Sequence, residues 1–267
     1  MTCQITRPNY PSYYKDCLDF FRGPLDLTKI PWTTSDIRAE ITKRSTHEPN
    51  SYRDWVSLGL TNFRWELIWP TVHTSYASGF QQDIHYLLLH NALYTNLFLS
   101  KFQDPTTDKY CDFCRASGNH REEGIFHLFF QCKPANQLWK KVLPLLKLIL
   151  NSNTINRTNI LFNKFPTGTV LHAKKLALSV IQIIIQRIWL SRNDFKHKSV
   201  HSDPDICMRI ICHNVMNMVK AKFNIFKRRN KLRKFCKLFC YNQNFCQVDT
   251  HQRLHFPFLQ IVFTPPR

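Results

Sequence analysis

The stretch CDFCRASGNHREEGIFHLFFQC, residues 111–132, decides the fold because it places four metal-ligand residues in a regular spacing. Cys111 and Cys114 are followed by His127 and Cys132 in the pattern C-x2-C-x12-H-x4-C. Zn²⁺ takes thiolate and imidazole donors in tetrahedral geometry, so these four side chains predict a zinc site. Because four protein ligands leave no position for water, the site is predicted to be structural rather than catalytic.

The surrounding residues support a folded site. Phe126, Leu128, Phe129 and Phe130 supply apolar surface around His127, which can dock the second ligand pair on a core. His120 is a competing fourth ligand, although it lies in a polar loop beside Arg121 and Glu122. The alternative interpretation is that the cysteines are buried thiols without metal, packed as small apolar groups.

Residues 111–139, with the C-x2-C pair, Glu122-Glu123, HLFFQC and Trp139, resemble the zinc-binding domain that follows the reverse transcriptase of LINE-type, non-LTR retrotransposons. FQQDIHYLLLHNALYTNLFL (80–99) is similar to the family's LH..L.TN..L helix. PSYYKDCLDFF (11–21) and RDWVSLGL (53–60) resemble the connector after the polymerase thumb. TNILF (158–162) and IWLSRN (188–193) are similar to its ILFG and IW..RN elements, although Asn163 replaces the usual glycine.

The resemblance implies a C-terminal part of such a polyprotein that helps to hold template RNA or target DNA. The family's polymerase needs a paired-aspartate turn, and the chain contains no adjacent Asp-Asp pair. A glycine-rich phosphate loop is also missing from the sequence. We therefore expect no catalytic residues, no enzyme activity and no small-molecule substrate, with a reverse transcriptase on another chain as a candidate partner.

Charge is distributed unevenly along the chain. Residues 1–139 carry 14 basic and 14 acidic residues, whereas residues 140–267 carry 23 basic and only four acidic ones. The formal net charge of +19 therefore lies entirely after the zinc motif. A surface this basic attracts polyanions, which predicts binding to RNA or DNA, while a solvated basic surface without a partner is the alternative.

The densest basic segment is KRRNKLRKFCK, residues 227–237. We expect it to continue the preceding helix and to contact phosphates through Lys227, Arg228, Arg229, Lys231, Arg233, Lys234 and Lys237. Nearby aromatic side chains could stack on single-stranded bases, namely Phe226, Phe235, Phe239 and Tyr241. A nuclear import signal or a solvated helix end would have the same composition.

A second metal site near the C-terminus is conceivable, but its sequence pattern is less specific. Cys236, Cys240, Cys246 and His251 are sufficient in number for a second site but match no common ligand spacing, so buried thiols are the simpler interpretation. The N-terminus has no apolar signal segment, and the longest apolar stretch, 176–190, is interrupted by polar residues. We expect an intracellular protein, nuclear or in cytoplasmic ribonucleoprotein, without membrane contact.

The periodicity of apolar residues predicts an all-α protein. Helices are expected near 13–21 and 34–42, over 80–102, 135–150 and 171–196, and from Pro204 onwards, where Ser202 and Asp203 form the N-cap. The last helix should bury one stripe, formed by Ile206, Ile210, Ile211, Val215, Met218, Val219 and Phe223. Trp189 should face the core, while Arg192 reaches outward and Asn193 caps the end of the helix.

We therefore predict helical modules around a small CCHC zinc knuckle, followed by basic C-terminal helices. The expected divisions are a connector over 1–75, a helix plus zinc-binding domain over 76–139, and a basic helical region over 140–267. The predicted function is nucleic-acid binding. The alternative function is a protein-interaction scaffold, in which structural zinc and the Trp-rich N-terminal region form a docking surface.

Overall fold

The computed structural model describes residues 51–59, 63, 65–101, 108–156, 161–162 and 164–263. The chain divides into two compact units, Met1–His47 and Glu48–Arg267, and every described residue belongs to the second. The helices expected near 13–21 and 34–42, the connector sequence 11–21 and the substituted Asn163 lie outside the described residues. The domain boundaries expected after residues 75 and 139 both fall within the second unit.

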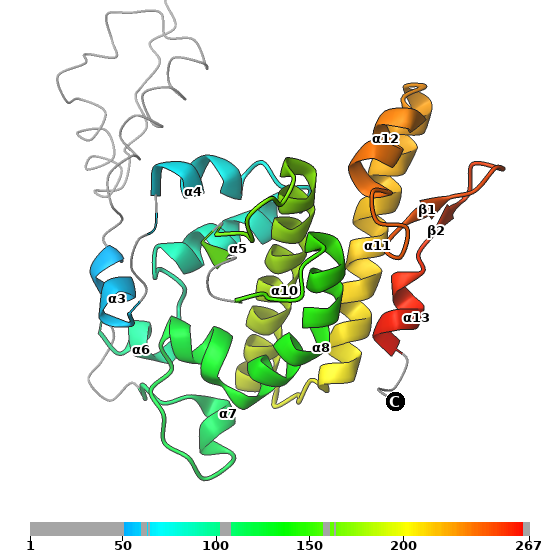
Figure 1. Ribbon diagram of the computed structural model, residues 1–267. Coiled ribbons are helices and arrows are strands. Elements are labelled where there is room, and N and C mark those ends of the chain that lie inside the picture. Colours follow the sequence, from blue (N-terminus) through cyan, green and yellow to red (C-terminus); the bar gives the residue numbers. More distant parts are fainter. Residues whose placement is uncertain are drawn as a thin grey trace, which may run out of the picture. The chain divides into compact units, whose positions relative to one another are not determined.

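The described chain is mostly helical, which confirms the predicted all-α class. Its helices appear in Figure 1 in the order α3 (Tyr52–Ser57), α4 (Trp65–Val72), α5 (Gly79–Leu89), α6 (Asn96–Leu99), α7 (Asp112–Arg115), the π-helical turn η1 (His127–Gln131), α8 (Lys133–Leu150), α10 (Leu171–Lys198), α11 (Pro204–Arg228), α12 (Leu232–Phe239) and α13 (Phe258–Phe263). Strands β1 (Gln247–Val248) and β2 (Leu254–His255) form a small antiparallel hairpin in which Gln247 pairs with His255.

Helix α10 is the centre of the second unit and packs against α5, α8 and α11 (Figure 1). Its residues from Leu176 to Ile185 are buried on every side, because neighbouring helices cover each face. The apolar stretch expected to form a buried helix therefore does so. No helix in the described ranges has both the length and the apolar character that a bilayer span requires.

A buried polar network joins α10 to α5. Ser75 donates a hydrogen bond to Gln182 Oε1 over 2.5 Å, and Gln182 Nε2 donates to the Val72 carbonyl and to His85 Nδ1 over 2.8 and 3.3 Å. His85 Nε2 lies 3.2 Å from the Leu161 carbonyl, and because that oxygen can only accept, Nε2 carries the proton. Burial lowers the pKa of His85 to about 4, so the imidazole is neutral in the folded protein.

The expected single helix over 80–102 is wrong. Helix α5 ends at Leu89, and Asn91 follows in the left-handed region at φ 52°. A new short helix, α6, then begins after Thr95, whose side-chain oxygen accepts a hydrogen bond from the Phe98 amide. Asparagine tolerates the left-handed conformation and threonine is a good N-cap, so these local preferences override the apolar periodicity.

Helix α11 begins as expected, with Asp203 accepting a hydrogen bond from the Asp205 amide and Pro204 in the first turn. It does not continue through the basic segment. The helix ends at Arg228, Asn230 adopts φ 52°, and the chain starts the separate helix α12. Ile206 was wrongly placed on the buried stripe, since it is 54% exposed in the first turn of the helix.

Candidate metal centre and basic surface

The first ligand pair lies on a tight hairpin. A β-bridge pairs Tyr110 with Glu122, and the Cys111 amide donates to the Arg121 carbonyl over 2.8 Å. Helix α7 makes one turn between Cys111 and Cys114, and the Asn119 amide then donates to the Cys114 carbonyl. Gly118 closes the loop at φ 74°, a conformation that disfavours other residues. The hairpin therefore turns both thiols to the same side.

The second ligand pair brackets η1. Its wide helical turn places His127 and Cys132 at opposite ends, and the Cys132 amide donates to the His127 carbonyl over 2.7 Å. Between them, Leu128, Phe129 and Phe130 are buried in the core. Trp139 of α8 donates its indole N–H to the Phe129 carbonyl over 2.7 Å. The apolar flank thus docks the ligand pair, as the sequence predicted.

The four ligand atoms lie within 4.8 Å of one another, close enough to hold a metal ion. Cys111 Sγ is 3.7 Å from Cys132 Sγ, and Cys114 Sγ is 3.4 Å from His127 Nε2. A tetrahedral zinc with Zn–S bonds of about 2.3 Å and Zn–N bonds of about 2.0–2.1 Å requires edges of about 3.8 and 3.6 Å. The donor types, and the two separations just given, therefore fit a four-coordinate zinc site.

The thiols influence each other's protonation. The hydrogen bond from Cys132 lowers the pKa of Cys111 to about 4, and the same contact raises the pKa of Cys132. Burial raises the pKa of Cys114. A cation held between the three thiols would favour the thiolate form of each.

Neither competing metal-site interpretation is supported by the geometry. His120 is exposed, packs edge-on against Tyr110 at 5.6 Å between ring centres, and does not belong to the cluster. At the second cysteine group, Cys240 Sγ lies 3.7 Å from Cys246 Sγ, but His251 is on an exposed turn. Across the described residues, the group of Cys111, Cys114, His127 and Cys132 is the sole cluster suited to a metal.

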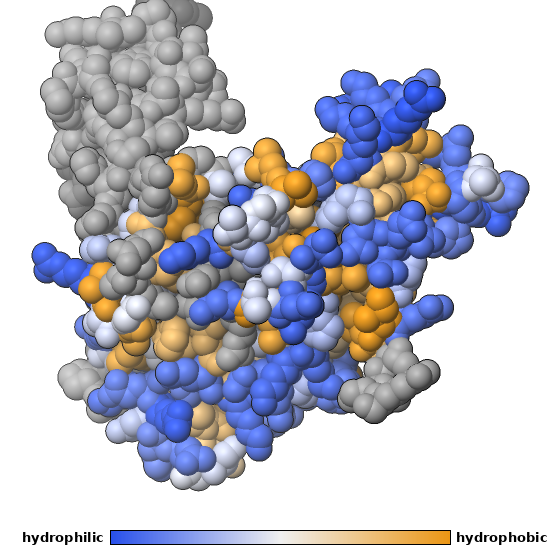
Figure 2. All heavy atoms as spheres, in the orientation of Figure 1, coloured by the Kyte–Doolittle hydropathy of each residue, from blue (hydrophilic) through white to orange (hydrophobic). Residues whose placement is uncertain are grey.

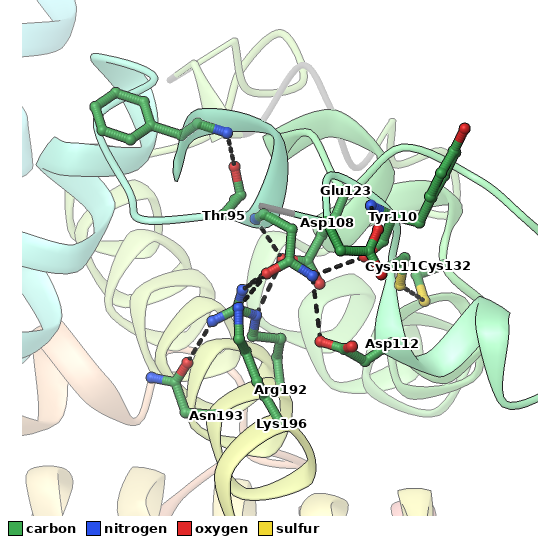
Figure 3. A network of polar contacts seen from close by, with 12 residues as sticks. Thr95, Asp108, Tyr110, Cys111, Asp112, Glu123, Cys132, Arg192, Asn193 and Lys196 are labelled. Atoms are coloured by element: carbon green, nitrogen blue, oxygen red, sulfur yellow. Dashed lines mark hydrogen bonds and ion pairs between the residues drawn. The ribbon is translucent and has the colours of Figure 1, made fainter. Parts of the chain in front are cut away.

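We call the hairpin of residues 109–123, which carries Cys111 and Cys114, the metal hairpin. A buried ion pair fastens it to α10 (Figure 3). Arg192 donates from Nη2 and Nε to Glu123 Oε1 over 2.6 and 3.1 Å, and it also donates from Nη2 to Asn96 Oδ1 over 2.8 Å. The side chains of Arg192 and Glu123 are 4% and 0% exposed. Burial raises the pKa of Glu123, while the Arg192 guanidinium counteracts this rise.

Asn96 extends this network to the hairpin itself. Its amide nitrogen Nδ2 donates to the Tyr110 carbonyl over 2.7 Å and to Asp112 over 3.2 Å, beside Cys111, while its backbone N–H donates to Glu123 Oε1. Lys196 also donates to Asn96 Oδ1. Residues from α6, the hairpin and α10 therefore meet around one buried carboxylate.

The role expected for Arg192 and Asn193 was wrong. Helix α10 continues to Lys198, with Ser199 as its cap at φ 55°, so neither residue lies at the helix end. Arg192 points inward because the carboxylate of Glu123 is its partner, and Asn193 accepts a hydrogen bond from Arg192 Nη1 over 3.0 Å. Trp189 is only partly buried and lies under the guanidinium, with 5.2 Å from the ring centre to Arg192 Cζ.

The predicted basic residues gather where α11 ends and α12 begins. We call the following side chains, all exposed, the basic tip: Lys227, Arg228, Arg229, Lys231, Arg233, Lys234 and Lys237. None of them forms an ion pair with any acidic residue that the structure describes. In Figure 2, the upper end of the α11–α12 arm is correspondingly hydrophilic. Its positive charge is therefore not neutralised within the described chain.

The aromatic residues of this region do not form the expected stacking surface. Phe235 and Phe239 are fully buried and stack on each other with 4.8 Å between ring centres. Phe226 packs against Phe235, and Tyr241 donates its hydroxyl to the Ile149 carbonyl over 2.6 Å. These side chains hold α12 on the rest of the unit. Burying such large apolar rings is more favourable than leaving them exposed to water for stacking on bases.

Comparisons of the chain with protein-family models, curated proteins and solved structures each give no match.

Proposed function

We propose that the chain binds one Zn²⁺ through Cys111, Cys114, His127 and Cys132. Three sulfur donors and one imidazole nitrogen within 4.8 Å of one another are the observation that supports this choice of metal. Zinc would supply a structural cross-link between the hairpin and η1. The ion pair of Glu123 with Arg192 would then transmit the position of that cross-link to α10.

We further propose that the chain is a nucleic-acid-binding module in which the basic tip contacts phosphates. The observation that carries this function is seven exposed cations in eleven residues without an acidic partner among the described residues. Lys and Arg side chains in this state bind a polyanion by releasing its condensed counterions. The metal hairpin, by contrast, has local ion pairs such as Lys109 with Glu122 at 2.6 Å, which balance its charge. It would therefore help to position the protein on the nucleic acid rather than attract the nucleic acid by charge.

The module is proposed to resemble the C-terminal part of a non-LTR retrotransposon reverse transcriptase, holding RNA or target DNA without polymerase activity of its own. Supporting this likeness, three of its sequence segments contribute Asn96, Glu123 and Arg192 to a single network. A zinc-containing region that orders the helices carrying the basic tip is consistent with such a role.

The alternative function, a protein-interaction scaffold, has one observation in its favour. Phe80 and Leu87, seven residues apart on α5, are 57% and 39% exposed, and exposed apolar surface of this kind can bind proteins. Two of the tryptophans that the structure describes in the N-terminal region do not contribute to the expected docking surface. Trp55 and Trp65 are each only 2% exposed and belong to the core.

A salt titration of RNA and DNA binding by the purified zinc-loaded chain separates these functions. If nucleic acid binds through the basic tip, its affinity should fall steeply as salt is added, and log Kd should rise linearly with the logarithm of the salt concentration. A scaffold predicts weak binding at every salt concentration. If the wild-type chain binds neither RNA nor DNA at low salt, the proposed function is wrong.

A further inference from the structure

A groove lies beside α11, below the basic tip. It has a volume of about 330 Å³ and is lined by Tyr76, Ile183, Asn214, Met218, Lys222 and Ile225, among others. Three parts of the chain form it: the segment that leads into α5 together with the first turn of that helix, the middle of α10, and α11. A volume of this size is at the lower end of the range for small-ligand sites. The groove can therefore accommodate a group of the size of a nucleobase.

The groove leads directly to the basic tip. Asn214, Met218 and Lys222 follow at intervals of four residues on one face of α11, and Ile225 and Arg228 continue that face at intervals of three. Arg228 is therefore only about 5 Å further along the helix axis than Ile225. A ligand bound in the groove and a charge bound at the tip can consequently belong to one short strand.

The lining combines apolar and polar groups in the way that a base requires. Ile225 is 43% exposed, and Ile183 and Met218 add apolar surface below it. The Asn214 carboxamide is half-buried and has no side-chain hydrogen bond to any residue that the structure describes. It can both donate to and accept from the edge of a base.

A cation stands beside this apolar lining. Lys222 Nζ lies 5.5 Å from the centre of the Tyr76 ring and forms no ion pair within the described part of the chain. Tyr76 is fixed in turn by its amide, which donates to Ser179 over 2.8 Å, and by packing on Phe239. The ammonium group is thus held at the rim of the groove, where it can meet a phosphate.

We infer that the groove binds an unpaired nucleobase of a single strand whose phosphates lie along Lys222 and the basic tip. This inference rests on the proposed nucleic-acid binding and adds a preference for single strands over duplexes. In a duplex the bases are stacked and paired, so none is free to enter the groove, and the phosphates provide the main contact. A single strand can insert a base as well, and each base packed on protein contributes additional affinity.

The test uses the full zinc-loaded chain with a fluorescent single-stranded oligouridylate and a DNA duplex of the same length. Ala221→Phe fills the groove from an exposed position of its lining without changing the charge. We expect it to weaken oligouridylate binding about tenfold, because one base can no longer pack on the protein, and to leave duplex affinity unchanged. Asn224→Phe, an exposed position of α11 that does not line the groove, should leave both affinities unchanged.

Photo-crosslinking gives a second measurement. An oligouridylate containing 4-thiouridine should crosslink to the α11 peptide in the wild type and lose that crosslink in Ala221→Phe. The inference is overturned if Ala221→Phe binds oligouridylate as tightly as the wild type, which is also the result expected if the groove binds a protein. If the wild type binds neither probe, the proposed function itself is wrong. Failure of the groove inference and failure of the proposed function therefore give different results.

Discussion

The guanidinium of Arg192 lies 2.6 Å from the carboxylate of Glu123, and both side chains are almost completely shielded from water. The two residues are 69 positions apart, one on α10 and the other on the metal hairpin. Glu123 Oε2 is buried without a hydrogen-bond partner among the described residues, so the pair is only partly compensated for the loss of water. Its main effect is to fix the hairpin in one position on α10.

Replacing one partner should be far more damaging than replacing both. Arg192→Met leaves the Glu123 carboxylate buried and unpaired, which should lower the free energy of unfolding by about 3–5 kcal/mol. The double variant Arg192→Met with Glu123→Leu should be more stable than Arg192→Met alone, since it removes the buried charge. Urea denaturation of the wild type, both single variants and the double variant measures the coupling.

Lys198→Met is the matched control for that cycle. It breaks an ion pair with Asp194 at the exposed end of the same helix, where Lys198 is 69% exposed. The expected loss is at most about 1 kcal/mol. Equal effects of Arg192→Met and Lys198→Met would contradict the role assigned to the buried pair.

The convergence of Cys111, Cys114, His127 and Cys132 was predictable from sequence because their spacing alone restricts the chain. C-x2-C fits one helical turn, and His127 and Cys132 fit the two ends of another, so local geometry determines which atoms converge. The buried partners of the hairpin were not predictable. Nothing local to Arg192 shows that a carboxylate 69 residues earlier will lie against it, and an isolated Arg near a helix end is usually solvated.

Two helix boundaries were predicted wrongly for a related reason. Asn91 and Asn230 both adopt positive φ and end helices that the apolar pattern would have continued. Asparagine also occurs within helices and loops, so an asparagine in the sequence does not by itself predict a left-handed residue at the end of a helix. Likewise, the aromatic residues were expected to stack on bases because they lie near the basic segment in sequence, whereas α12 buries Phe235 and Phe239.

Zinc binding should distinguish the two histidines of the motif. His127→Ala removes a ligand from the cluster, so the purified variant should lose bound zinc and become less stable. His120→Ala should retain one zinc per chain, because His120 is exposed and outside the cluster. Native mass spectrometry measures the zinc content of each variant, and hydrogen exchange measures the loss of stability. Chelation should first expose the amides of 111–139, since metal binding is coupled to local folding.

A wild-type chain that folds fully without zinc would contradict this prediction, as would full zinc occupancy in His127→Ala. Cys212→Ser provides a control for general damage to the core. Cys212 is buried in α11 and away from the cluster, so this variant should keep its zinc even if its stability falls.

Stability should decrease as the pH falls from about 6.5 towards 4, in part because of His85. Its folded-state pKa, about 4, is below the ordinary value of 6.5, so the unfolded chain takes up a proton that the folded chain does not. The resulting loss in the free energy of unfolding is on the order of 3 kcal/mol at the acidic end of this range. His85→Gln should therefore flatten the pH dependence of urea denaturation over this interval.

The control for this measurement is His213→Gln, on the exposed surface of α11. It should keep the wild-type pH dependence, because it leaves His85 and its buried hydrogen bonds to Gln182 and Leu161 intact. The explanation through His85 fails if His85→Gln and His213→Gln give the same pH dependence as the wild type.

The basic tip should determine how nucleic-acid binding responds to salt. Replacing Arg228, Arg229, Arg233 and Lys234 by Gln removes four exposed cations that have no acidic partner among the described residues. Affinity for RNA and DNA should fall about uniformly across sequences, and the slope of log Kd against log salt should decrease by roughly one unit for each phosphate that the protein no longer neutralises. Zinc-ligand variants should lower affinity with less change in slope, because they misplace helices without removing charge.

A charge-matched variant makes this result specific to the tip. Lys133, Lys140, Lys141 and Lys147 are exposed on α8, and their replacement by Gln removes the same formal charge from another surface. If binding depends only on net charge, the two quadruple variants should lose affinity and slope equally. If the tip contacts phosphate directly, the α8 variant should keep most of the wild-type slope. An unchanged slope in the tip variant would instead make those residues a solvated surface and favour the scaffold function.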